Sequence, residues 1–149
     1  MKTKFIFFFL PIILLLLYCN SINKFPNDKE KIKNLINNYS TSFDLKNFEE
    51  FISFCTDDFK FFTLDGQVFD RNSIGNFLKR VMARWSNLKT KIEELDIHVG
   101  KRLAFASYKQ KLSYVSGSKN GVMHNLITVT FIKINSTWEM AHFHMTTKY

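Results

Sequence analysis

Cysteine is scarce in this chain, which has only Cys19 and Cys55 among its 149 residues. Cys19 follows an apolar N-terminal segment, so a domain that begins after that segment keeps only Cys55. A single cysteine has no partner within the chain, and this excludes a small domain held together by disulfide bonds. Cys55 stands among Phe51, Ile52 and Phe54, which favours a buried thiol that packs like a small apolar side chain.

Several patterns that identify enzymes are missing as well. The sequence has no glycine-rich phosphate loop, no dinucleotide fingerprint, no Ser-His-Asp order and no internal repeat. His142 and His144 alternate along one expected strand, but two imidazoles without a further ligand make a poor metal site. We therefore predict no metal ion, no cofactor and no established catalytic set.

Negative charge is the rarer sign: 13 acidic residues stand against 21 Lys and Arg, giving a formal net charge of +8. The positive residues are scattered and form no nucleic-acid motif, so we predict no nucleic-acid partner. Solvated faces are the favoured interpretation of this charge. Attraction to anionic lipid headgroups near an anchored N-terminus is the alternative.

The N-terminus has the pattern of a secretory signal peptide. Lys2 and Lys4 precede an apolar run from Phe5 to Tyr18. This run is too short to cross the ~30 Å hydrocarbon layer as a helix, which needs about 20 residues. We predict that residues 1–18 are a signal peptide and that the protein is exported. An uncleaved hydrophobic anchor is the alternative.

The stretch Leu16-Leu17-Tyr18-Cys19 resembles the signal of bacterial lipoproteins, although Tyr18 stands where that signal usually has a small residue. The resemblance implies a lipid on Cys19 and a protein anchored to a membrane of the bacterial cell envelope. A soluble secreted or periplasmic protein is the alternative. Residues 19–27 are polar and are expected to form a tether, and residues 28–149 are expected to form one domain.

The first part of this domain has helical patterns. Asn27 and the glutamate three residues later have the spacing of a capping box, and apolar residues at helical spacing extend a first helix to about Phe43. Asp44 is expected to cap a second, shorter helix. A third helix is expected to begin near Asn72 and to bury Trp85.

From there the apolar pattern has a period of two, which is typical of strands. The expected strands cover residues 59–64, 67–69, 89–99, 102–115, 122–134 and 137–148. Helices followed by a long meander predict an α+β fold, with three N-terminal helices packed on a strongly bent antiparallel sheet.

The last strand carries an unusual row of side chains. Because side chains alternate across a strand, Trp138, Met140, His142, His144 and Thr146 are expected to share one face. The side chains at the start of the row are apolar, and those at its end can form hydrogen bonds. This gradient is typical of the wall of a pocket.

The order of these elements, with Asp57-Asp58-Phe59, Gly66, the helix from Asn72, and the ending 128–131 and 138–146, carries a family resemblance. Residues 28–149 resemble the nuclear-transport-factor-2-like superfamily and, within it, the SnoaL-like bacterial domains. The resemblance implies a cone, in which a bent sheet wraps over the first helix and leaves a cavity. It also implies a homodimer through the outer face of the sheet.

The resemblance extends to enzymes of this superfamily, the ketosteroid isomerases. It places Tyr39 at their hydrogen-bonding tyrosine and Thr63 at the position of their base. Threonine does not take a proton from carbon at neutral pH, so this isomerase chemistry is not expected.

The sequence therefore predicts a binding domain for a small apolar molecule. The residues expected to line its pocket are Tyr39, Trp85, Tyr108, Thr130, His142 and His144. One alternative is an isomerase, hydrolase or cyclase that uses His144 and Tyr39. Another alternative is a protein-interaction or dimerisation module whose pocket is filled by side chains.

Overall fold

The computed structural model describes residues 25–148. Its helices are α2 (Pro26–Asp44), α3 (Phe48–Ser53) and α4 (Arg71–Val81), and its strands are β1 (Cys55–Phe62), β2 (Val68–Asp70), β3 (Trp85–Val99), β4 (Leu103–Ser116), β5 (Lys119–Ile134) and β6 (Thr137–Lys148). The predicted signal peptide and the predicted lipid attachment at Cys19 lie outside the described residues. Within residues 25–148, none of the helices has the length and apolar composition to cross a membrane.

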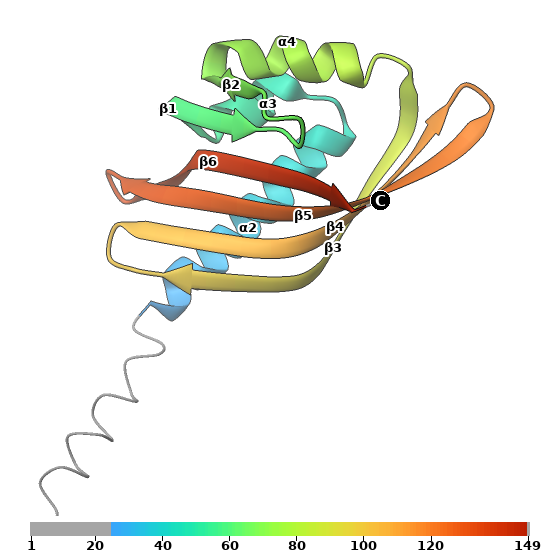
Figure 1. Cartoon of the computed structure of the whole chain (residues 1–149). Helices are drawn as coiled ribbons and strands as arrows, with labels where there is room; N and C mark the ends of the chain where they lie inside the picture. The colour runs from blue at the N-terminus through green and yellow to red at the C-terminus, as the bar shows by residue number, and fades with distance from the viewer. Residues whose placement is uncertain (1–24, 149) are drawn as a thin grey trace, which may run out of the picture.

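The six strands form one curved sheet in the order β2-β1-β6-β5-β4-β3. Figure 1 shows α2 lying across one face of this sheet, with α3 and α4 at the end formed by β1 and β2. We call the face toward α2 the inner face and the opposite one the outer face. The expected α+β fold is confirmed, with one correction to the sheet: β1 pairs with β6 in parallel, and the other neighbours are antiparallel.

Helix α2 packs on the sheet through one apolar stripe. Ile32, Ile36 and Tyr39 recur at helical spacing and are at most 2% exposed. Burial of each such side chain stabilises the fold by about 1.5–3 kcal/mol. The helix begins at Pro26, whose fixed φ suits a first turn, and no side chain caps it. The capping box expected at Asn27 is therefore wrong, and the helix begins inside the predicted tether.

The other end of α2 also differs from the expectation. Asp44 is the last residue of the helix and accepts hydrogen bonds from the backbone N–H (2.8 Å) and the hydroxyl (2.6 Å) of Thr90 on β3. The cap of α3 is Asn47, whose side chain accepts from the N–H of Glu50. The predicted capping role of Asp44 is wrong, because its carboxylate connects α2 to an edge strand.

The curvature of the sheet comes from inserted residues in β3. The pairing of β3 with β4 shifts between Ser86 and Lys89 and again between Glu93 and Asp96. Within these two irregular segments, Asn87 and Glu94 both have a φ of 52°. Such bulges bend a strand and increase its twist, so β3 curves around α2.

An ion pair fixes the first turn of α2 to the sheet. The Lys133 ammonium on β5 lies 2.8 Å from the carboxylate of Asp28, which is only 8% exposed, and 5.4 Å from the ring centre of Trp138. The hydrogen bond from Lys133 holds the pKa of Asp28 below its ordinary value. The pair therefore links the start of the helix to the inner face.

Replacement of Asp28 tests this link. Because its folded-state pKa is lowered, the carboxylate stabilises the fold above its unfolded pKa of about 3.9, and this contribution is lost as the pH falls through the folded pKa. We expect Asp28→Asn to lower the free energy of unfolding at pH 7, and we expect the difference from the native protein to shrink in acid. Urea unfolding between pH 7 and pH 3 measures both effects.

The matched control is Glu30→Gln, because Glu30 is largely exposed and lies 3.9 Å from Lys33. Its free energy of unfolding should stay close to that of the native protein, as is usual for surface pairs. A destabilisation by Asp28→Asn that is constant down to pH 3 would contradict the role of the carboxylate.

Candidate functional site

The last strand changes face at Ala141. Thr130 of β5 pairs with His142, whereas the next residue of β5, Phe131, pairs with Met140. Ala141 is therefore an extra residue in β6 without a partner in this register. One extra residue reverses which side chains point inward beyond it.

The two halves of β6 consequently present different residues to the core. Trp138 lies in the core before the bulge, and Phe143 and Met145 pack inward after it. His142 and His144 are exposed and lie on the outer face. The prediction that both histidines share a face with Trp138 and line the pocket is wrong, because it assumed an uninterrupted alternation.

The outer face holds these histidines beside other side chains. The ring of Phe62 on β1 lies edge-on to both, with ring centres 6.1 Å from His142 and 6.5 Å from His144. Thr130 pairs with His142 on one side and with the exposed Phe105 on the other. Thr130 is thus also on the outer face, and its predicted place in the pocket is wrong.

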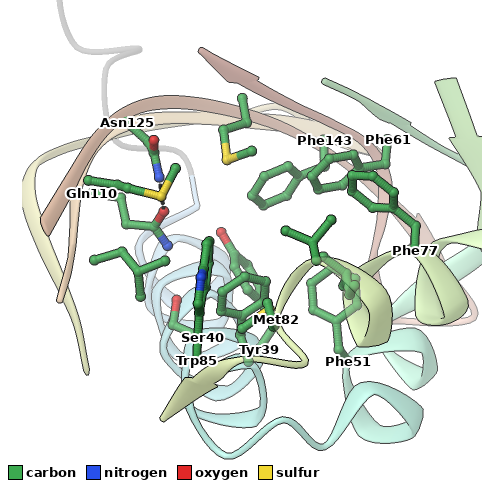
Figure 2. A pocket seen from close by; sticks show the side chains of 16 residues that line it. Tyr39, Ser40, Phe51, Phe61, Phe77, Met82, Trp85, Gln110, Asn125 and Phe143 are labelled. Atoms are coloured by element: carbon green, nitrogen blue, oxygen red, sulfur yellow. Dashed lines mark hydrogen bonds between the residues drawn. The ribbon is translucent and has the colours of Figure 1, made fainter. Parts of the chain in front are cut away.

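A cavity of about 90 Å³ lies between the helices and the inner face. Figure 2 shows the aromatic rings of Phe61, Phe77 and Phe143 gathered on one side of it. The side chains that line it are Tyr39, Ser40, Phe43, Phe51, Phe61, Phe77, Leu78, Val81, Met82, Trp85, Gln110, Leu112, Met123, Asn125, Phe143 and Met145. None of these is charged, and Tyr39 and Trp85 are the two predicted pocket residues among them.

The polar groups of the cavity lie on the side opposite the three phenyl rings (Figure 2). Asn125 on β5 donates its amide hydrogen to Oε1 of Gln110 on β4 at 2.8 Å. The hydroxyl of Thr147 donates to Oδ1 of Asn125 at 3.0 Å. Ser40 of α2 completes this side.

Tyr39 and Tyr108 join α2 to β4 through a hydrogen bond between their hydroxyl groups. Tyr39 lines the cavity, whereas the buried Tyr108 is not among the lining residues. Burial raises the pKa of both phenols above the ordinary value of about 10, so both stay neutral at physiological pH. Tyr39 does not meet His144, because the two lie on opposite sides of the sheet.

Trp85 lines the cavity; it is the first residue of β3 and not part of the third helix as expected. Its ring stacks on Tyr114, with ring centres 4.3 Å apart. The Tyr114 ring covers Gly121, where an added Cβ would lie 2.3 Å from a ring atom. The Lys46 ammonium donates to the carbonyls of Met82 and Trp85 and fixes the turn before β3.

Cys55 and Thr63 could in principle take part in chemistry, but the contacts of both residues indicate structural roles. Cys55 is buried, and burial raises the pKa of its thiol to about 12, which leaves it protonated and unreactive. The hydroxyl of Thr63 bonds to Asp65 and to the carbonyl of Gln67 in the turn after β1. Across residues 25–148, no group of three or more His, Cys, Asp or Glu side chains is arranged to hold a metal ion.

The model of a family described as the SnoaL-like domain matches residues 32–147. The chain belongs to the SnoaL-like domain family. This confirms the resemblance stated from the sequence. A search of curated proteins finds no match to this SnoaL-like chain.

Solved structures share the fold of this SnoaL-like domain at low sequence identity. A candidate scytalone dehydratase from Novosphingobium aromaticivorans is 13% identical, with a TM-score of 0.75 over 82% of this chain and 85% of the other. A candidate dehydratase of the nuclear-transport-factor-2-like family from Streptomyces avermitilis is 12% identical, with a TM-score of 0.75 over 83% and 98%. The association domain of C. elegans CaMKII is 16% identical, with a TM-score of 0.68 over 80% and 95%. These similarities confirm the nuclear-transport-factor-2-like fold.

Sequence reasoning missed most of the wall of the SnoaL-like cavity. Phe143 and Met145 had a detectable signal, because the apolar positions change phase after Met140, at the small residue Ala141. Ser40 and Gln110 had no comparable signal. A serine in a helix and a glutamine in a strand usually face solvent.

Proposed function

We propose that this SnoaL-like domain binds a small, neutral, largely apolar molecule in its cavity. The observation that supports this most directly is the lining itself, which is mostly aromatic and aliphatic and has no charged side chain. Pockets for drug-sized ligands have volumes of about 300–1,000 Å³, so a cavity of about 90 Å³ favours a short molecule. Met82, Met123 and Met145 have adaptable side chains that can make additional room.

The lining favours binding over catalysis by proton transfer. A general acid or base works best when its pKa lies near the operating pH. Tyr39 is the ionisable side chain in the lining, and burial raises its pKa well above the ordinary value. The alternative enzyme needed His144 beside Tyr39, and His144 lies on the outer face. The two candidate dehydratases share the fold, which does not by itself transfer an activity.

A tryptophan placed in the lining tests the binding proposal. Met145 lines the cavity, and its neighbour Thr146 points to the outer face. We expect Met145→Trp to fill the space and to weaken binding of fluorobenzene at least tenfold, as measured by ¹⁹F NMR titration. Thr146→Trp adds the same ring outside and should leave the affinity unchanged. Equal affinities of the native protein and both variants, or no binding to the native protein, would reject the proposal.

We also propose that two copies of the chain associate through the outer face. This face exposes large apolar side chains, including Leu103 (59%), Leu126 (49%) and Phe105 (44%). Exposed apolar patches on a soluble domain commonly mark protein interfaces. A second copy is the occupant we favour, because the C. elegans neighbour of the same fold is an association domain.

A charge in this patch tests the association. We expect Phe105→Glu to shift the protein from dimer to monomer in sedimentation velocity, because a carboxylate is costly to bury at an interface. Leu45→Glu is the matched control, since Leu45 is 71% exposed and follows α2 in a segment that belongs to no strand. A native protein that sediments as a monomer, or a Phe105→Glu variant that stays dimeric, would reject the interface.

We further propose that the protein is exported and anchored by a lipid on Cys19. The support is the sequence pattern of residues 1–19. In a bacterial host fed an alkyne-tagged fatty acid, we expect the full chain to be labelled and to fractionate with membranes. Cys19→Ser should lose the label, and the matched variant Cys55→Ser should keep it. Absence of the label from the native protein, or its persistence in Cys19→Ser, would overturn the anchor.

A further inference from the structure

The hydroxyl of Ser40 is a buried polar group without a partner. Ser40 is 6% exposed, and within residues 25–148 its Oγ makes no hydrogen bond. The neighbouring hydroxyls of α2 behave differently: Thr41 donates to the carbonyl of Asn37 at 3.0 Å, and Ser42 donates to that of Tyr39 at 2.8 Å. An unpaired buried hydroxyl costs free energy. The Ser40 hydroxyl lines the cavity and is therefore free to bond a molecule inside it.

A second donor faces the same space. Oε1 of Gln110 is occupied by the amide of Asn125, which is itself held by the hydroxyl of Thr147. This relay orients the Gln110 side chain so that its Nε2 group is turned into the cavity (Figure 2). The hydroxyl of Tyr39, also on this wall, is already bonded to Tyr108. Ser40 and Gln110 are thus two neutral donors in the lining that a ligand can reach.

The rest of the cavity defines the body of that ligand. The rings of Phe61 and Phe143 stack with centres 5.0 Å apart, and Phe77 lies beside them (Figure 2). These rings favour an aromatic or alkyl group on the side away from Ser40. A charged head group would be buried without an opposite charge, which is strongly unfavourable.

We propose that the cavity binds a small neutral carbonyl compound, such as a ketone, ester or amide. Its apolar body packs on the phenyl rings, and its carbonyl oxygen accepts hydrogen bonds from the Ser40 hydroxyl and from Nε2 of Gln110. One carbonyl oxygen has two lone pairs and can accept from both donors. This inference rests on the proposed binding function and names the class of its ligand.

A pair of ligands of matched shape tests the inference. Acetophenone carries the carbonyl group, and α-methylstyrene replaces its oxygen with a methylene group. We expect the native protein to bind acetophenone about tenfold more tightly in NMR titrations, because a ligand without the acceptor leaves both donors unpaired. Ser40→Ala should remove most of this preference and leave the affinity for α-methylstyrene unchanged.

Ser42→Ala is the matched control, since the Ser42 hydroxyl is bonded to the backbone and Ser42 is not among the lining residues. It should keep the preference for acetophenone. Ser40→Ala should not lower the melting temperature, because it removes a buried hydroxyl that has no partner. A folding defect would therefore not confuse the comparison.

The outcomes separate the two proposals. Equal affinities of the native protein for both ligands, or an unchanged preference in Ser40→Ala, would overturn the carbonyl inference and leave binding in the cavity intact. Tighter binding of benzoate than of acetophenone would overturn the neutral class. Failure of all these ligands to bind would overturn the proposed function, and the inference with it.

Discussion

The insertion of Ala141 into β6 is the constraint on which the site depends. Strand pairing must be kept on both sides of β6, because β5 and β1 flank it. The extra residue lets Trp138 pack near the start of α2 while Phe143 and Met145 face the cavity further along. With an uninterrupted alternation, the exposed histidines would occupy that wall, and the cavity would have polar, titratable sides.

Helix α2 gives the cavity its second wall, and polar contacts hold it at both ends. Asp28 bonds to Lys133 near its start, and Asp44 bonds to Thr90 at its end. Between them the apolar stripe packs on the sheet, and the Tyr39–Tyr108 pair crosses from helix to strand. The residues of α2 that line the cavity are Tyr39, Ser40 and Phe43, and all of them lie in the C-terminal half of the helix.

Much of the fold follows from periodicity in the sequence. The four long strands were predicted from the period of two, with bounds differing from the observed ones by at most four residues. The helix ends were harder, because Asn27 and Asp44 both have the side chain of a cap but only the three-dimensional context decides whether a chain turns there. The site was hardest. A single inserted residue leaves the composition of β6 unchanged yet exchanges its two faces, and the roles of Ser40 and Gln110 depend on burial and on partners far away in the sequence.

The positions of the two tryptophans have a consequence for fluorescence spectroscopy. The chain has two tryptophans, and they occupy contrasting places. Trp138 is buried beside the ammonium of Lys133, whereas Trp85 is partly exposed and lines the cavity. Light absorbed by the two indoles is therefore emitted from different environments. The protein carries a native fluorophore in the lining of its cavity and a second one, outside that lining, as an internal reference.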